Sequence, residues 1–354
     1  MSRLTTSRRN FLKASAALSA CTFAASVRAA APLAETITPA LIEAAKKEGQ
    51  VVWYTSADLQ LAQLVGKAFE RKFPGVAVRV ERAGAERIYT RVGQEYASGI
   101  HAVDAVNTGD AAQFLAWKRQ KFFAPYVPED VAKHIPPAHR DPDGLYATLR
   151  STLCVIAYNT ELVKREEAPK SFADLLDPKW KGKIVKAHPS YSGTIITSTY
   201  QMVRELGWGY LEKLSQQNVL QVQSATDTPK KIALGERAVM ADGNEYNIIL
   251  LKEAGRPVEP VYAAEGSPFI IMPSAVFAAA PHPNAARLFQ NYLFSPEGQQ
   301  LFVDLGALRS LHALVKDKPG RTPLSAIKVW KDDPAAAEQQ SEEIKRRYSQ
   351  YFKV

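Results

Sequence analysis

The sequence predicts an α/β protein with two lobes, and three observations lead to this prediction. Runs typical of strands and helices alternate from residue 38 to residue 106, which favours a parallel sheet covered by helices. The same pattern recurs from about residue 145 to residue 269. Without its first 29 residues the 354-residue chain keeps about 325, which is enough for two lobes of typical domain size.

The first lobe is predicted to begin with a helix, since Thr38 can cap it, Pro39 suits its first position and Gly49 ends it. Strands at 51–55, 76–80 and 103–106 then alternate with helices whose apolar positions run from 61 to 69 and from 86 to 98. In parallel sheets ligands collect at the carboxyl ends of the strands. Those ends carry Ser56, Gly84 and the stretch 108–110.

The second lobe is predicted from strands at 153–158, 184–185 and 239–241 and from a helix that begins near Ser192. The long apolar run 269–279 is a strand that would carry the chain back to the first lobe. Helices are predicted to follow at 283–294 and 296–305, and the charged tail from Ser325 is predicted to be helical.

The first thirty residues have the features of an export signal. Ser7–Lys13 places paired arginines ahead of Phe-Leu-Lys, and the Ala-rich run that follows is too short and too weakly apolar for a permanent membrane span. Val27–Ala29 supplies the small residues that a signal peptidase requires. We therefore expect a twin-arginine signal peptide at 1–29 and a mature protein in the periplasm. The alternative is a lipoprotein, because Leu18–Cys21 has the form of a lipobox.

The net charge argues against a nucleic-acid-binding protein, and the cysteine content excludes a disulfide-bonded one. Residues 1–29 hold five basic residues and no acidic one, so the formal charge of +9 falls to +4 without them. A charge this small and evenly spread argues against binding to nucleic acid. Cys154 is then the only cysteine, which excludes an intrachain disulfide, and its apolar neighbours indicate a buried small hydrophobe.

Seven segments of the chain resemble the periplasmic solute-binding proteins of ABC importers, in the branch that includes the ferric-ion-binding proteins. The segments are 51–56, 103–106, 157–160, 171–184, 189–194, 281–286 and 295–299, of which Ser171–Ile184 is the most specific. The resemblance implies a periplasmic-binding-protein type II fold, with two α/β lobes joined by crossover strands and hinge closure around a ligand in the cleft. It implies lobe 1 at 36–147, lobe 2 at 148–269, a return to lobe 1 at 270–306 and a C-terminal helical segment at 307–354.

Ferric iron is the second candidate for the ligand. Ferric-binding relatives place an adjacent pair of tyrosines where Gly243–Asn247 of this chain has Tyr246 alone, and they commonly add a histidine that 56–58 lacks. Fe(III) prefers phenolate and carboxylate oxygens. Tyr246 with Asp58, Asp242 or Glu245 would hold it only with help from a bound anion, so we predict no resident metal.

A small anionic or zwitterionic solute is the first candidate. The 189–194 loop leads into a helix whose first amides and dipole would face the cleft, although plain capping by Ser192 is the alternative. Arg150 at the first crossover suits a carboxylate or phosphonate, unless it forms a surface salt bridge. Arg87 lies either at the cleft or on a solvated helix face. The acidic Asp242, Glu245 and Asp58 suit an ammonium group, and Tyr246 would stack on the ligand or pack in the core.

The predicted ligand-binding residues are Ser56, Asp58, Arg87, Thr108, Arg150, Ser151, Ser190, Ser192, Gly193, Thr194, Asp242, Glu245 and Tyr246. We predict a monomeric substrate-binding component of an ABC transporter that captures a small polar or anionic solute (phosphonate, carboxylate or zwitterion) and delivers it to the membrane permease. The alternatives are a ferric-iron-binding protein and an enzyme built on the same two-lobed fold. The sequence has no triad spacing, metal-ligand cluster or cofactor loop, so we predict no catalysis and no cofactor.

Overall fold

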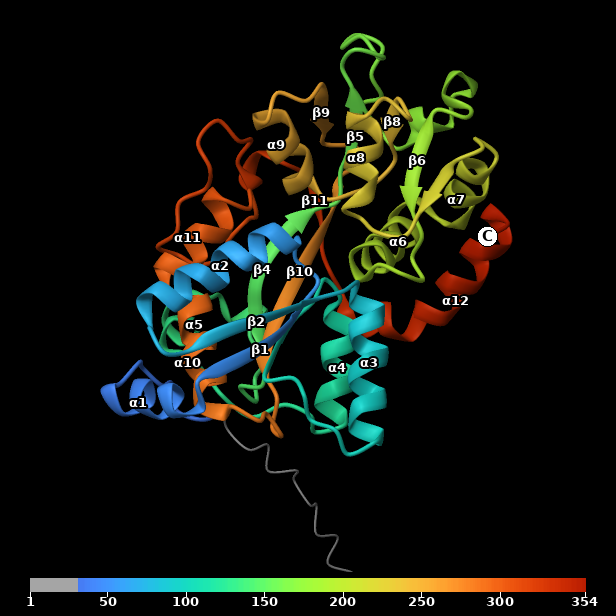
Figure 1. Cartoon of the computed structure of the whole chain (residues 1–354). Coiled ribbons are helices and arrows are strands. Elements are labelled where there is room, and N and C mark those ends of the chain that lie inside the picture. Colours follow the sequence, from blue (N-terminus) through green and yellow to red (C-terminus); the bar gives the residue numbers. More distant parts are fainter. Residues whose placement is uncertain (1–30) are drawn as a thin grey trace, which may run out of the picture. The chain divides into compact units, whose positions relative to one another are not determined.

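Two β-sheets with helices on their faces make up residues 31–354, the part of the chain that the computed structural model describes (Figure 1). These residues form one compact unit. The predicted α/β class with two lobes is confirmed. The predicted signal peptide and the lipobox at Cys21 lie outside the described residues.

The first sheet defines the first lobe and has the strand order β11-β10-β3-β1-β2, with β4 paired to β10. β1 is parallel to β2 and β3, whereas β10 is antiparallel to β3 and β4. Its strands are β1 (Gln50–Thr55), β2 (Ala77–Arg82), β3 (Ala105–Asn107), β4 (Ala147–Leu153), β10 (Ser267–Val276) and β11 (Val329–Trp330). Its helices are α1 (Pro39–Glu48), α2 (Leu59–Lys72), α3 (Ala85–Ala97), α4 (Ala111–Arg119), α5 (Glu129–His134), α10 (Pro283–Phe294) and α11 (Pro296–Asp304).

The second sheet defines the second lobe and has the order β7-β6-β8-β5-β9. Its strands are β5 (Ile156–Asn159), β6 (Ile184–Ala187), β7 (Leu220–Val222), β8 (Val239–Met240) and β9 (Val258–Val261). Its helices are α6 (Gly193–Leu206), α7 (Trp208–Ser215), α8 (Asp227–Ala233) and α9 (Glu245–Glu253). Single 3-10 turns are η1 (Pro137–His139), η2 (Ala173–Leu176), η3 (Pro178–Trp180) and η4 (Leu324–Ala326).

Local signals explain where the first-lobe helices begin. Thr38 accepts a hydrogen bond from the amide of Leu41, and Gly49 ends α1 with a φ of 76°. Asp58 accepts bonds from Gln60 and Leu61 at the start of α2. These caps satisfy amides that have no partner inside a helix, so they fix the loops that follow β1 and precede the helices.

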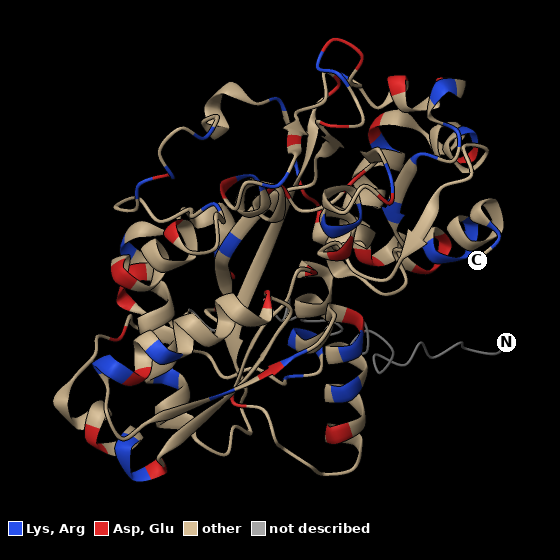
Figure 2. Cartoon of the chain, turned by 45° about the horizontal axis from the view of Figure 1, so that its top comes forward, with Lys and Arg blue, Asp and Glu red and all other residues tan. Residues whose placement is uncertain are grey.

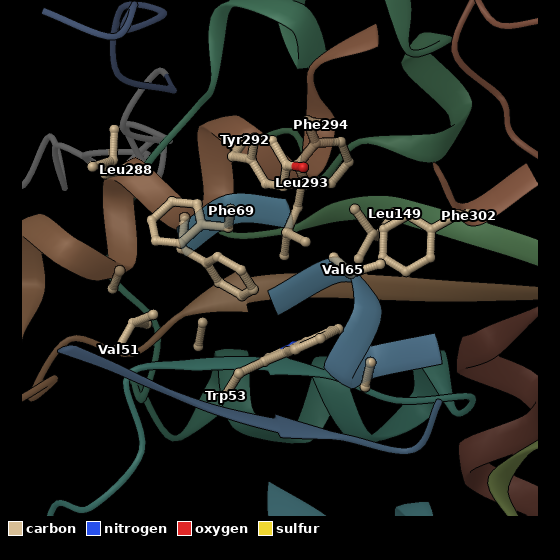
Figure 3. Packing of buried hydrophobic residues seen from close by; sticks show 14 of the residues in the cluster. Val51, Trp53, Val65, Phe69, Leu149, Leu288, Tyr292, Leu293, Phe294 and Phe302 are labelled. Carbon is tan, nitrogen blue, oxygen red and sulfur yellow. The ribbon is translucent and has the colours of Figure 1, made fainter. Parts of the chain in front are cut away.

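An aromatic and aliphatic core holds β1 in place. Trp53 and Phe69 both pack edge-on against Phe289 of α10, with ring centroids 5.3 and 5.0 Å apart. Figure 3 shows Trp53 and Phe69 facing Tyr292 and Leu293 across this core. Burial of large side chains contributes about 1.5–3 kcal/mol each, so the strand end that precedes Ser56 is rigidly supported.

The crossover between the lobes differs from the prediction in one respect. The predicted strand 153–158 is two strands, because β4 ends at Leu153 and β5 begins at Ile156 in the other sheet. Cys154, buried between them as predicted, instead forms an isolated bridge with Asn244. β10 pairs with β4 from Phe269 to Ser274, with a register shift between Met272 and Pro273.

The C-terminal segment also needs a correction. Residues 307–333 are not α-helical: they contain η4 and β11, which pairs with the start of β10. The helix of the predicted tail, α12 (Pro334–Phe352), begins only at Pro334, where Asp333 caps it. None of the helices within residues 31–354 combines the length and apolarity needed to cross a bilayer.

Candidate functional site

Arg150 lies at the junction of the two lobes, on β4. Arg150 is 1 % exposed, so the predicted alternative of a surface salt bridge is wrong. Its Nε donates to Oδ1 of Asn107 at 2.7 Å, and its Nη2 is buried with no hydrogen-bond partner among the described residues. Burial lowers the pKa of Arg150 to about 10, which the Tyr246 phenol partly offsets. The guanidinium therefore stays charged at neutral pH, with donors left over.

Asn107 positions this guanidinium, and the sequence analysis missed it. Asn107 ends β3, and its Nδ2 donates to the carbonyl oxygens of Met272 and Pro273 at 3.1 and 2.7 Å. These carbonyls flank the register shift in β10, where proline has no amide to continue the ladder. The available signal was the location of Asn107 at the carboxyl end of a parallel strand, directly before Thr108.

Tyr246 and Arg82 act electrostatically on Arg150, and Asp58 acts on Tyr246. Burial raises the pKa of the buried Tyr246, the guanidinium of Arg150 and then that of Arg82 lower it, and the carboxylate of Asp58 raises it. Arg82, which ends β2, also donates through Nε to the carbonyl of Ala57 at 3.3 Å. The sequence analysis missed Arg82 as well, although it ends a parallel strand. Two guanidinium groups thus accompany one carboxylate and one phenol here.

The start of α6, in the second lobe, lies against the first-lobe loops that follow β2 and β3. Ser192 holds the N-cap position, but its side chain makes no capping hydrogen bond, so plain capping does not explain it. The amides of Gly193 and Thr194 belong to the first turn, where helix amides have no intrahelical acceptor. A side chain on Gly109 would place its Cβ 2.7 Å from Oγ1 of Thr194, so the two lobes touch at this point.

Other first-lobe residues of the predicted set support the loops around this contact. Ser56 accepts a hydrogen bond from the amide of Gly109 through its Oγ at 3.0 Å. Thr108 is buried and its Oγ1 lies 3.5 Å from Oε1 of Gln113. Asp58 serves as the cap of α2, as described above. These contacts fix the loop geometry on the first-lobe side.

The predicted acidic cluster does not form. The buried carboxylate of Asp242 accepts from Nζ of Lys186 at 2.7 Å and from Oγ of Ser198 at 3.0 Å. Glu245 is paired with Arg309 at 2.7 Å and with Arg321 at 2.6 Å, and it also accepts a hydrogen bond from the hydroxyl of Tyr262. A carboxylate already neutralised by a buried cation has little to offer an ammonium group. The expectation that Asp242 and Glu245 suit an ammonium group is therefore corrected.

Three more predicted residues have contacts other than those expected. Ser151 donates through Oγ to the carbonyl of Arg309 and forms a backbone bridge with the same residue. The amide of Ser190 donates to Nδ1 of His188. Arg87 is exposed and donates to Oε1 of Gln223 at 2.8 Å, which joins α3 of the first lobe to the second lobe.

Two cavities within residues 31–354 lie away from Arg150. Each cavity has a volume of about 490 Å³. One is lined by Tyr126 and Phe294 among others. The other is lined by Phe269 and Ile271, on the opposite face of β10 from Met272. No three His, Cys, Asp or Glu side chains of this part of the chain are grouped so that they could hold a metal ion. Basic and acidic residues are interspersed along the elements of both lobes (Figure 2).

Comparison with known proteins identifies the family. Residues 107–324 match the family described as bacterial extracellular solute-binding protein. An uncharacterised protein of Haemophilus influenzae is 27% identical over 267 residues, which is 73% of this chain and 76% of that protein. Iron uptake protein A1 of Synechocystis is 29% identical over 126 residues, 35% of this chain and 34% of its own.

Two solved structures share the fold. The periplasmic binding protein AfuA from Actinobacillus pleuropneumoniae, with fructose-6-phosphate bound, superposes with a TM-score of 0.79 at 23% identity, covering 86% of this chain and 99% of AfuA. Iron-bound HitA from Pseudomonas aeruginosa gives a TM-score of 0.74 at 21% identity, covering 84% and 99%. The family match spans well over half of the chain. This protein therefore belongs to the bacterial extracellular solute-binding proteins, as a periplasmic substrate-binding component of an ABC transporter.

Proposed function

We propose that the cleft of this receptor binds a small solute through an anionic group, which Arg150 recognises. The observation that carries the proposal is the charge of Arg150, whose guanidinium is buried and keeps its charge. Among residues 31–354 it has no ion-pair partner, and its Nη2 has no hydrogen-bond partner. A buried charge without a counter-ion is costly to a folded protein. An anion supplied by the ligand would remove that cost.

The surroundings of Arg150 supply further donors for an anion. Arg82 adds a second guanidinium, and the first turn of α6 adds amides and the positive end of a helix dipole. Asp242 and Glu245 are already paired with cations, so neither carboxylate is left for a cationic solute. A phosphonate, phosphate ester or carboxylate fits this balance of charge.

The burial of the site implies how a solute reaches it. Arg150 is enclosed and Gly109 touches Thr194, so a solute reaches the guanidinium only after the lobes separate. β4 and β10 connect the lobes and are the segments at which hinge rotation would occur. We further propose that the protein is exported by the twin-arginine pathway, acts as a monomer and catalyses no reaction.

A thermal-melting screen of anionic metabolites, followed by calorimetry of the hits, tests the proposal. Loss of a charge-assisted hydrogen bond typically costs about 1.5–3 kcal/mol, so Arg150→Ala should weaken binding roughly ten- to a hundredfold. The matched control is Arg256→Ala, which removes an exposed arginine of the second lobe at the end of α9. Wild-type affinity in Arg150→Ala would refute the role of Arg150.

Ferric iron is the second candidate, favoured by the sequence match to Iron uptake protein A1. Tyr246 is the phenol available for it, and burial raises its pKa, which disfavours the phenolate that Fe(III) requires. The screen therefore includes ferric citrate. An intense visible charge-transfer band that disappears in Tyr246→Phe would replace the anion by iron as the physiological ligand.

A further inference from the structure

The C-terminal helix α12 is fixed to the second lobe by apolar contacts. Ala337 and Ile344 pack with Ile196 and Tyr200 of α6 in one buried cluster. Tyr348 is fully buried and donates through its hydroxyl to Oε1 of Gln221 at 2.9 Å. Burial of this kind acts at short range and, unlike an ion pair, is not weakened by the screening of charges. α12 is thus expected to move with the second lobe as one body.

With the first lobe, α12 packs beside α4 and adds ion pairs to that contact. Nζ of Lys345 lies 3.1 Å from Oε2 of Glu86 on α3. Near the other end of the helix, Glu338 pairs with both terminal nitrogens of Arg119 on α4. Figure 1 shows α12 passing from the ends of α3 and α4 to α6 and α7. The helix therefore spans both lobes beside the cleft.

The Lys345–Glu86 pair is close to the residues of the proposed site. Glu86 is in the first turn of α3, between Gly84 and Arg87, whose side chain also reaches the second lobe. Both partners of the pair are about one-fifth exposed, at 22% and 19%. Burial alone would lower the pKa of Lys345, but the Glu86 carboxylate raises it, so the lysine is charged. A small cavity of about 170 Å³ lies between α3, α4 and α12 around these side chains.

We propose that α12 is an electrostatic latch on the closed cleft: it is carried by the second lobe and grips the first lobe through Lys345 and Glu338. The latch stabilises the closed state without touching the solute. It thereby sets how much of the receptor is closed and how long a bound solute stays. This proposal rests on the proposed function for its effect on affinity, but not for its effect on the unliganded protein.

The test compares Lys345→Met with Arg347→Met. Arg347 is two residues further along the same helix, and its substitution removes the same charge. Among the described residues, its ion pair is with Glu343 of α12, and its guanidinium lies over the ring of Trp208 in the second lobe. The solute should dissociate faster from Lys345→Met than from the wild type. Its affinity should be about three- to fivefold weaker, as expected for the loss of a partly exposed ion pair. Lys345→Met should also give a larger radius of gyration in small-angle scattering without ligand. Arg347→Met should match the wild type in all three.

Two additions make the result specific to the ion pair. In a double-mutant cycle, Glu86→Gln should weaken binding in the wild type and have no further effect in Lys345→Met. Raising sodium chloride from about 50 mM to about 1 M should remove the difference between wild type and Lys345→Met, because salt screens this pair. A larger radius or faster dissociation confined to Lys345→Met supports the latch.

Two results would refute the latch and the proposed function separately. If Lys345→Met and Arg347→Met have the same dissociation rate and radius, the latch is refuted even when Arg150→Ala loses binding. If no anion binds the wild type, the proposed function fails, and the scattering of the unliganded variants still decides on the latch.

Discussion

Arg150 differs from the other deeply buried charged residues in what compensates its charge. Lys186 is paired with Asp242, and Glu245 is held by Arg309 and Arg321. In the part of the chain that the structure describes, the one hydrogen-bond acceptor of Arg150 is the neutral amide oxygen of Asn107, and that bond occupies Nε. In the proposed binding mode the ligand would take the terminal nitrogens, which suit a planar or tetrahedral group of oxygens.

Asp110 gives a second test at the scale of one residue. It caps α4, lies against Gly193 of the second lobe and is buried, which raises its pKa to about 8, helped by the nearby Glu86. An unfolded aspartate releases its proton near pH 4, so the folded state holds an extra proton between about pH 4 and pH 8. The folded state is therefore expected to lose stability as the pH rises through that window.

The variant Asp110→Asn should remove this dependence. Asparagine also caps helices and carries no charge. Between pH 5 and pH 8 the free energy of unfolding should therefore fall less in the variant than in the wild type, and the two falls should differ by on the order of 2 kcal/mol. Urea unfolding at the two pH values measures it, with Asp333→Asn at the exposed cap of α12 as the control for the substitution. An identical pH dependence in wild type and Asp110→Asn would show that Asp110 is ionised throughout.

At the scale of elements, the start of α6 and the loops after β2 and β3 come together because glycines leave them room. A Cβ on Gly84 would lie 2.9 Å from the carbonyl of Tyr191. One on Gly193 would lie 2.6 Å from Cβ of Asp110 and 2.8 Å from Cβ of Ala85. All these contacts join one lobe to the other, so the glycines are needed for closure rather than for the fold of either lobe.

Gly193→Ala should therefore weaken solute binding without lowering the melting temperature of the unliganded protein. Alanine favours helix over glycine, so α6 itself gains stability, but its methyl group holds the lobes apart. We expect a loss of affinity of roughly tenfold or more by calorimetry. Gly93→Ala on α3, where a Cβ meets nothing within 4 Å, is the control. Wild-type affinity in Gly193→Ala would mean that the solute-bound state keeps the lobes further apart here.

Elements with local signals could be predicted from the sequence, and those set by distant contacts could not. The helix at 283–294 has the predicted bounds because Pro283 begins it and Ser295-Pro296 starts the next. The division of 153–158 into β4 and β5 depends on pairing with β10 and with β8 and β9, over 80 residues away. The delayed start of α12 depends on β11, whose two residues pair with β10.

The same limit applies to the candidate site. Arg150 and the 190–194 loop could be located from their places at a crossover and a helix start. The neutralisation of Asp242 and Glu245 could not, because Lys186, Arg309 and Arg321 are 56, 64 and 76 residues distant in sequence. Ion pairing across such distances follows from the tertiary fold, which no local pattern records.

At the scale of the whole molecule, the proposed site is formed by elements of both sheets. The first sheet and its crossover strand hold Arg150 and Asn107, and the second presents the start of α6. In the proposed site each half is incomplete alone, so the proposal requires closure for binding, and closure is where the proposed latch on α12 would act. A family of solute receptors uses one such frame for different ligands because the fold supplies the motion and individual side chains supply the specificity.

The crystal structure of the protein with the solute returned by the melting screen tests the central claim most directly. The account predicts an anionic group of the solute within about 3 Å of Nη2 of Arg150, enclosed between the 56–58 and 108–110 loops and the first turn of α6. A solute bound elsewhere, with Nη2 of Arg150 still without an acceptor, would contradict it.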